Sequence, residues 1–368
     1  MSKPKKNLGK LKRYKRIFHT RDQLVRTALA WVAGIAALFV VGYAVAPAVL
    51  DFGTHTWYTV VKGRDLEPSS SAPAESLAAE SAPSEVQAEP EATPEPTPEP
   101  AVEKGNWAFA SLSGFSTPEK SAETARQYKE AGVHYVVIPL KDSTGYLYYQ
   151  SALPDGAKSV AATTIDAAAA ASALREEGLE PVASICAFQD PIAPYTNRDM
   201  GIRYQDTEYF WLDAAQEAGG KPWLDPWSDS AVNYVAGVIS EVKSMGFSTI
   251  LLSGVQYPPY ATSSCGYQNG GTATAERLAS LLSDWSNSLS SDGGTLWVQY
   301  PLATVASADP VTAIGGVYAD LGVERLMIAM PAEAPENQEE LLTAATEAAK
   351  SAGTENISIK TGDNAVFQ

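Results

Sequence analysis

Two aspartates that lie one residue beyond apolar runs are the residues best placed to do chemistry in this chain. Asp142 follows the run near 134–140, and Asp190 follows the run at 181–188. Such runs predict buried strands, and neighbouring parallel strands bring their carboxyl ends to the same edge of a sheet. Two carboxyl groups held together can act as general acid and base, or as a nucleophile. Asp142 and Asp190 are therefore the predicted catalytic residues if the protein is an enzyme.

The same aspartates also fit structural roles. Asp142 follows Lys141 in a "KDSTG" turn, where an aspartate often caps the turn. Asp190 and Asp225 each precede a proline, and Asp-Pro commonly begins a turn. The structural interpretation is favoured for all three. A catalytic pair and ligand binding without turnover remain as alternatives.

A third apolar run ends without any acid. The stretch "FSTILLSGVQYPP" (247–259) places Ser253, Gly254 and Gln256 at the predicted junction of strand and loop. In an α/β barrel, catalytic residues come from such junctions. This end of the predicted sheet therefore offers only neutral groups.

Aromatic residues gather in the loops that follow two of these runs. The loop at 189–228 contains Tyr195, Tyr204, Tyr209, Phe210, Trp211, Trp223 and Trp227, and the next loop adds Tyr257, Tyr260 and Tyr267. Aromatic faces with polar tips suit the apolar faces of sugar rings, although a long loop also uses aromatics to pack itself. We expect stacking on a glycan by Trp211, Trp223, Trp227 and Tyr257, with polar contacts from Lys141, Asp225 and Gln256.

Seven strand-like runs alternate with six helical patterns from residue 106 onward. The runs are 107–114, 134–140, 181–188, 248–254, 295–301, 325–331 and 356–362. The helical patterns are 117–131, 165–178, 229–245, 272–291, 309–321 and 335–352. Continuous apolar strands separated by helices predict a parallel sheet covered by helices.

This alternation predicts an α/β fold of the TIM type, a (β/α) barrel over residues 106–368. An open dinucleotide-binding sheet is disfavoured because no GxGxxG sequence follows the first run. An eighth strand has no clear signal, and "AVFQ" at 365–368 is the only candidate. Either the barrel is incomplete or a short strand lacks a recognisable pattern.

The N-terminus has the pattern of a membrane anchor. Ten lysines and arginines lie in residues 1–26, and residues 27–50 carry no charge. About 20 apolar residues span a bilayer as a helix, and positive charge stays on the cytoplasmic side. We expect a cytoplasmic tail (1–26), one transmembrane helix (27–50) serving as a signal anchor in the cell membrane, and an extracellular C-terminal domain. A cleaved signal peptide is the alternative, because "AVA" at 44–46 has the form of a cleavage site.

Residues 51–105 are predicted to be a disordered extracytoplasmic linker. The segment 65–104 contains eight prolines, ten acids and one lysine, with alanine and serine between them. Such a composition buries too little apolar surface to fold, and its prolines and like charges keep it extended. The linker would hold the following domain away from the membrane.

Charge and residue counts exclude several classes of function. The chain has 27 basic and 43 acidic residues, and ten of the basic ones precede the predicted membrane helix. The acidic remainder argues against nucleic-acid binding through a basic face. Only three histidines and two cysteines, Cys186 and Cys265, are present, so a histidine-based zinc site is not expected, and no cofactor is assigned. Acidic loops leave calcium binding open, but no EF-hand-like spacing supports it and no metal ligand is named. Whether the cysteines form a disulfide stays open.

Three short blocks resemble a known family. They are "KD-G" (Lys141, Asp142, Gly145), "F-DP" (Phe188, Asp190, Pro191) and "WLDP" (Trp223, Leu224, Asp225, Pro226). Together with their spacing over about residues 106–300, they resemble the glycoside-hydrolase-like barrel family common on exported proteins of Gram-positive bacteria. That family is related to the α-amylase-type barrels, and its substrates are poorly defined. The resemblance implies a TIM barrel and carbohydrate chemistry.

A fourth block departs from the family pattern, which looks like "GFDEIQFDYVRFP". Gly246, Phe247 and Pro258 are kept, but the acids correspond to Ser248, Thr249 and Ser253, and the arginine to Gln256. By resemblance to amylase-type barrels, the acid on this strand would be the nucleophile. Glycoside hydrolysis ordinarily needs two carboxyl groups, and serine does not replace one of them. The resemblance therefore implies a barrel whose reaction centre is degraded.

These observations predict a membrane-anchored glycoside-hydrolase-like barrel that is catalytically impaired and binds a cell-envelope or extracellular glycan, such as a wall polysaccharide. One alternative is an active glycosidase whose carboxylates, Asp142 and Asp190, have been relocated. The other is a protein-interaction scaffold in the cell envelope.

Overall fold

The computed structural model describes residues 105–259 and 264–367, which all lie in one compact unit, Thr93–Gln368. The predicted tail, membrane helix and linker lie outside the described residues, apart from residue 105, and so does Tyr260. Within the described ranges, no helix is both long enough and apolar enough to cross a membrane.

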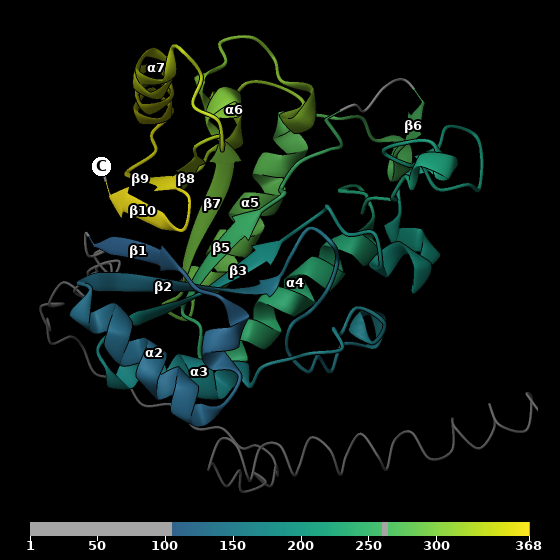
Figure 1. Cartoon of the computed structure of the whole chain (residues 1–368). Coiled ribbons are helices and arrows are strands. Elements are labelled where there is room, and N and C mark those ends of the chain that lie inside the picture. The colour runs from purple at the N-terminus through teal and green to yellow at the C-terminus, as the bar shows by residue number, and fades with distance from the viewer. Residues whose placement is uncertain (1–104, 260–263, 368) are drawn as a thin grey trace, which may run out of the picture. The chain divides into compact units, whose positions relative to one another are not determined.

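Eight strands form a closed barrel (Figure 1). Around the barrel they are β1 (Asn106–Phe109), β2 (Val133–Lys141), β3 (Glu180–Cys186), β5 (Thr249–Ser253), β7 (Thr295–Pro301), β8 (Arg325–Ala329), β9 (Asn356–Thr361) and β10 (Asn364–Phe367). The pairs from β1 round to β9 are parallel. The predicted TIM-type α/β barrel is thereby confirmed.

The eighth strand corrects the seven-strand prediction, because residues near "AVFQ" do close the barrel. β10 pairs antiparallel with both β9 and β1, and Ala365 lies opposite Lys360 on one side and Trp107 on the other. A tight turn at Gly362, where φ is +59°, lets the chain reverse after β9. A four-residue strand that follows a turn carries no helix-strand alternation, so the sequence pattern could not assign it.

Alternation along the strands separates the barrel interior from the helix-facing layer. One buried cluster fills the interior: Trp107, Tyr135, Val137, Val182, Leu251, Trp297, Met327 and Ala365. A second, larger cluster joins the intervening strand residues, such as Val136 and Ile250, to helix residues such as Leu174 and Val238. The interior is packed largely by aromatic rings, and Trp107 stacks on Tyr135 with ring centroids 4.2 Å apart.

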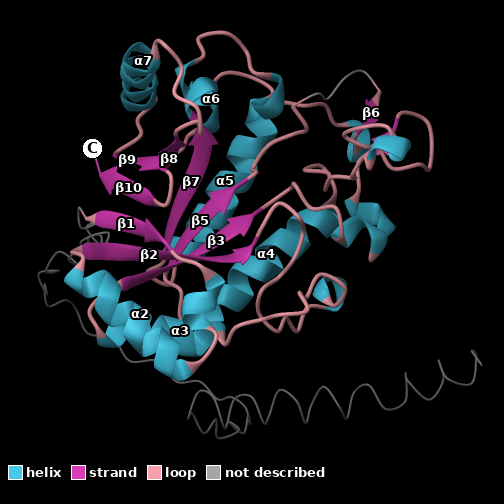
Figure 2. Ribbon diagram, in the orientation of Figure 1, coloured by secondary structure: helices cyan, strands magenta, loops and turns pink. Residues whose placement is uncertain are grey.

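Five of the six predicted helical patterns contain an α-helix (Figure 2). They are α2 (Pro118–Glu130), α3 (Ala167–Glu176), α4 (Asp229–Ser244), α5 (Ala275–Ser290) and α7 (Gln338–Ser351). Side chains of Thr117, Asp166, Ser228 and Thr274 accept hydrogen bonds from the first turns of α2 to α5, which fixes where these helices start.

The sixth pattern, 309–321, is a correction. It forms only two short 3-10 turns, η7 (Thr312–Ile314) and η8 (Tyr318–Leu321), because Gly315 between them takes a left-handed conformation with φ of +66°. A short helix that was not predicted, α6 (Leu302–Ala306), follows β7 directly.

Long loops after β3 and β5 form a separate feature, which we call the side arm (189–228 with 264–274). Two short strands in it, β4 (Arg203–Tyr204) and β6 (Cys265–Gly266), pair antiparallel. In Figure 1, β6 lies well apart from the barrel strands, on the side opposite α7. The side arm therefore brings together residues some 60 positions apart in the sequence.

Candidate functional site

The end of β5 carries the neutral residues that the sequence indicated. Ser253 ends β5, and Gly254 follows with a φ of +62°. A Cβ on residue 254 would lie 2.7 Å from the Cys186 Sγ atom, so only glycine fits where these strand ends meet. Gln256 is partly exposed just beyond. The geometry of a strand end is intact here, but no carboxylate is present on it.

Lys141 and Asp190, predicted as ligand-binding and catalytic residues, form a buried ion pair. The Lys141 Nζ atom lies 3.0 Å from the Asp190 Oδ2 atom, and both side chains are fully buried. Nζ also donates to the Cys186 carbonyl at 2.7 Å, and the Asp190 Oδ1 atom accepts from the amides of Ile192 and Ala193. This pair joins the end of β2 to the loop after β3.

The charges of this pair stabilise each other. Burial acts to lower the pKa of Lys141, but the Asp190 carboxylate together with Tyr234 and Cys186 outweighs burial and raises that pKa above its ordinary value. Gly145 makes room for the pair, since a Cβ there would lie 2.5 Å from the Asp190 Oδ1 atom. A carboxylate held so firmly, with no exposed surface, is poorly placed to exchange protons with a substrate.

Asp142 is held by its own turn rather than by Asp190. Its Oδ1 atom accepts from the Thr144 amide at 3.0 Å and from the Thr144 hydroxyl at 2.6 Å. Its Oδ2 atom accepts from the Tyr148 hydroxyl at 2.7 Å. Asp142 and Asp190 thus have separate sets of partners, and each set is one that a turn-forming aspartate makes.

The expected aromatic stacking surfaces are corrected by the structure. Trp211 and Trp223 are buried against Ile202 in a small core of the side arm, and the Trp223 indole donates to Asp213. Tyr257 is fully buried, with its hydroxyl on the Thr274 carbonyl. These rings pack the loop, because a long ordered loop needs its own core.

Trp227 is partly exposed, but its ring is also covered. The Arg277 guanidinium lies 5.0 Å from its centroid, and Gly271 approaches so closely that a Cβ there would overlap the ring. The indole nitrogen donates to the Thr272 carbonyl at 2.8 Å. Trp227 therefore anchors the 268–272 segment rather than presenting a free face.

Asp225 links two loops of the side arm from a fully buried position. Its Oδ1 atom accepts from the Trp227 amide at 2.9 Å, and its Oδ2 atom accepts from the Gln268 amide at 2.8 Å. Burial raises the pKa of Asp225 to about 6, although these two amides and Arg277 act in the opposite direction. It is placed to position Gln268 rather than to touch a ligand.

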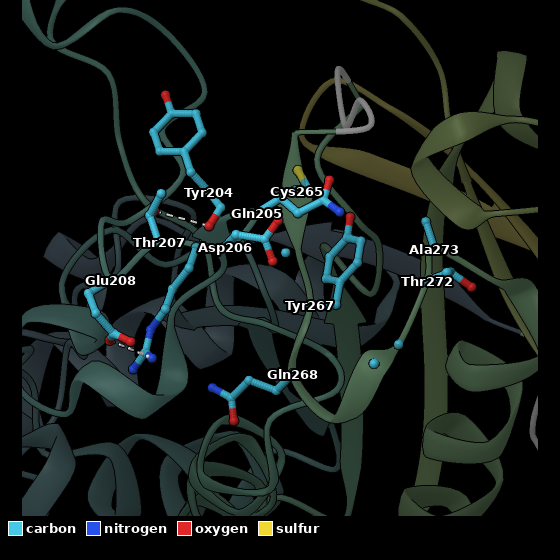
Figure 3. A pocket seen from close by; sticks show the side chains of 14 residues that line it. Tyr204, Gln205, Asp206, Thr207, Glu208, Cys265, Tyr267, Gln268, Thr272 and Ala273 are labelled. Carbon is cyan, nitrogen blue, oxygen red and sulfur yellow. Dashed lines mark hydrogen bonds and ion pairs between the residues drawn. The ribbon is translucent and has the colours of Figure 1, made fainter.

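Gln268 lines a cleft of about 900 Å³ in the side arm (Figure 3). Its walls are the segments 203–208 and 265–273, which flank β4 and β6. Gln205 and Asp206 stand on one wall and Tyr267 and Thr272 on the other, whereas the Tyr204 ring points outward at the rim. The cleft is wide enough for a small molecule or part of a polymer.

The cleft offers hydrogen-bonding groups of several kinds beside an aromatic ring. Its side chains include the carboxylate of Asp206, the amides of Gln205 and Gln268 and the hydroxyl of Thr272, beside the ring of Tyr267, whose own hydroxyl is buried. Asp206 is exposed, has a positive φ of 58°, and has no protein partner among the described residues. Arg203 is already paired with Asp199 and Glu208.

Sequence reasoning found the tyrosines of this site but missed its polar residues. Gln205, Asp206 and Gln268 lie in turns where polar residues are ordinary, so their types gave no signal. The two walls are distant in the sequence and are brought together by the pairing of β4 with β6.

The thiols and possible metal ligands add no second site. No disulfide joins Cys186 to Cys265. Within 105–259 and 264–367, no group of three or more histidine, cysteine or acidic residues could hold a metal ion.

The chain is similar to solved structures of carbohydrate enzymes. One is the cycloisomaltooligosaccharide glucanotransferase of a Paenibacillus species, at 8% identity and a TM-score of 0.50, over 69% of this chain and 37% of that one. Another is an α-galactosidase from Thermus thermophilus, at 12% identity and a TM-score of 0.43, over 72% and 52%. A hypothetical protein from Ruminiclostridium thermocellum, at 16% identity and a TM-score of 0.45, is covered over 96% of its length, and 52% of this chain matches it.

The chain spans only about a third to a half of the two enzymes, and at these identities the likeness to the glucanotransferase shows the fold alone. No curated protein matches the sequence. A family model described as "Putative glycosyl hydrolase domain" matches residues 109–318, which run from the end of β1 to the segment before β8. Because that match covers more than half of the chain and the matched residues build most of the barrel, the protein belongs to this glycosyl hydrolase domain family.

Proposed function

We propose that the protein is a membrane-anchored, extracytoplasmic glycoside-hydrolase-like barrel that binds a cell-envelope glycan without hydrolysing it. Membrane attachment through residues 27–50 and the disordered linker rest on the sequence alone. So do the relation to amylase-type barrels and the origin among exported proteins of Gram-positive bacteria. The barrel and the family membership support carbohydrate recognition as the general task.

The observation that carries this proposal is the side-arm cleft. Sugars present many hydroxyl groups beside apolar ring faces, and the cleft presents a carboxylate, two amides and hydroxyl groups around the Tyr267 ring. The Asp206 carboxylate has unused hydrogen-bond capacity, and bonds to an ionised acceptor are the strong ones.

Loss of catalysis is supported by the state of the strand ends. Ser253 and Gln256 stand where the resemblance places an acid and an arginine. Asp190 is neutralised by Lys141 inside the protein, and Asp142 is bonded within its own turn. A glycosidase needs one protonated carboxyl group and one ionised carboxylate facing the same glycosidic bond. Neither aspartate is free for that work.

We expect Asp206→Asn to weaken glycan binding about tenfold, because asparagine tolerates the left-handed backbone but lacks the ionised acceptor. Tyr204→Ala at the cleft rim should weaken binding by a similar factor if the chain of sugars extends past the rim. Binding of a panel of envelope and plant polysaccharides to the full chain, measured by calorimetry, tests both.

The matched control is Tyr209→Ala. Tyr209 is 76% exposed and sits beside Tyr204 in the same turn, but it does not line the cleft. Its replacement should leave affinity unchanged. Equal affinity in Asp206→Asn and the parent protein would contradict a binding site in the cleft.

The family description favours an active glycosidase as the second candidate, with Asp142 and Asp190 as its acids. We expect instead that the full chain releases no new reducing ends from the polysaccharide panel, as counted by mass spectrometry. Products that disappear in Asp142→Asn, a variant that leaves the buried ion pair intact, would establish hydrolysis and overturn the impaired barrel.

Exposed tyrosines outside the cleft keep the protein-interaction scaffold as an alternative. Tyr195 is 57% exposed, and Tyr209 is more so. Tyrosine is favoured at protein interfaces as well as at glycan sites. The scaffold would be favoured if the parent protein captured one envelope protein, if Tyr195→Ala failed to capture it, and if neither protein bound any glycan.

A further inference from the structure

The mouth of the barrel is a second place where polar groups converge. At the carboxyl ends of the strands, the inward-facing residues are Phe109, Pro139, Ser184, Ser253, Gln299, Ala329 and Lys360. All of them except Lys360 lie two positions beyond a residue of the interior cluster, and residues two apart in a strand share a face. Lys360 pairs with Ala365, which belongs to that cluster. All seven are partly exposed, whereas the interior cluster below them is buried.

The chemistry of this layer is the reverse of a glycosidase centre. It contains two hydroxyl groups, one amide and one ammonium group, and it contains no carboxylate. Lys360 is thus the only charged residue in the layer. A transition state of glycoside hydrolysis carries positive charge on the sugar, which an ammonium group destabilises and a carboxylate stabilises.

Lys360 is fixed with its ammonium group near the interior. β9 carries it opposite Ala365, a member of the interior cluster. Its Nζ atom lies 4.5 Å from the centroid of the Phe109 ring and donates to the Gly362 carbonyl at 2.8 Å. It forms no ion pair with a described carboxylate, so two of its three donors remain for a ligand.

The layer beneath the mouth also has an excess of donors. The indole N–H groups of Trp107 and Trp297 are buried inside the barrel and have no acceptor among the described residues. Indole nitrogen and ammonium groups donate and never accept. The barrel interior therefore favours an acceptor-rich, negatively charged group at its mouth.

We propose that the barrel mouth binds an anionic substituent of a glycan, a carboxylate or a phosphate, through Lys360 with Gln299, Ser184 and Ser253. This inference rests on the proposed glycan-binding function and names the ligand as an acidic glycan. The side-arm cleft would hold neutral sugar units, and the barrel mouth would select for the charge.

The test compares a tetragalacturonate with its carboxyl-reduced form, using the full chain and calorimetry. A short poly(glycerol phosphate) is the third ligand and separates phosphate from carboxylate. The acidic form should bind at least tenfold more tightly than the reduced form. Lys360→Met keeps the side-chain stem over Phe109 and should abolish that preference, whereas Lys360→Arg should keep most of it.

Lys350→Met is the control, since Lys350 is an exposed lysine on α7 and is not one of the seven residues of the mouth. It should bind like the parent protein, and all variants should melt at the same temperature. Equal binding of acidic and reduced ligands, or an unchanged preference in Lys360→Met, overturns the inference. If Asp206→Asn still weakens binding in that case, the proposed function stands; if no ligand binds, both are overturned.

Discussion

Asp190→Ala should lower the free energy of unfolding by about 3–5 kcal/mol, because it leaves the Lys141 ammonium buried without its counter-charge. The Nζ and Oδ2 atoms lie 3.0 Å apart with no exposed surface on either side chain. The change also removes the acceptor of the Ile192 and Ala193 amides. Urea unfolding of the full chain, followed by tryptophan fluorescence, measures the loss.

The double variant Lys141→Met with Asp190→Asn should be more stable than Asp190→Ala alone. It removes both charges together, so no isolated charge is left inside, and asparagine still accepts from the two amides. The comparison pair is Lys129 and Glu177, which lie 2.9 Å apart but are 57% and 28% exposed. Glu177→Ala should cost below about 1 kcal/mol. A similarly small cost for Asp190→Ala would contradict a structural ion pair.

The sequence motifs on which the family resemblance rests are parts of the framework. Lys141, Gly145 and Asp190 form one buried unit, and Asp225 with Trp223 holds the side arm together. These residues hold the strand ends and the side arm in place. They do not by themselves imply glycoside hydrolysis, because a glycosidase works through carboxylates that reach the substrate.

The barrel could be predicted because buried parallel strands have continuous apolar runs, and seven such runs matched seven strands. β10 was missed because a four-residue antiparallel strand has no pattern of its own. The segment 309–321 was assigned as one helix, because its composition does not indicate the left-handed conformation of Gly315 that interrupts it. Local patterns predict elements, but closure of a barrel depends on pairing between distant residues.

The site was harder to predict than the fold. Aromatic residues in the 189–228 loop were identified, but their types did not show which rings would pack the loop and which would stay exposed. Trp211 and Trp223 became its core, and Tyr209 remained outside. Large apolar rings gain most from burial, so Trp211 and Trp223 form the small core of the side arm, whereas the Tyr209 ring, which carries a hydroxyl group, stays exposed.

The free energy of unfolding should fall by about 2 kcal/mol between pH 4.5 and pH 7.5, because the carboxyl group of Asp225 loses its proton in the folded protein over this range. Burial raises the pKa of its carboxyl group to about 6 in the folded protein, from 3.8. The folded state therefore holds a proton in a range where the unfolded state has lost it. The stabilisation is fully present below pH 3.8 and is lost as the pH rises through 6.

Urea unfolding of the full chain across this pH range, compared with Asp225→Asn, tests the expectation. Asparagine offers one acceptor and turns an N–H group toward the second amide, so the variant should have a lower free energy of unfolding than the parent protein at both pH values. Its stability deficit relative to the parent protein should shrink by about 2 kcal/mol from pH 4.5 to pH 7.5, since only the parent has a titrating group there. A deficit in Asp225→Asn that stays constant from pH 4.5 to pH 7.5 would mean that the two amides and Arg277 outweigh burial, with the carboxylate ionised throughout.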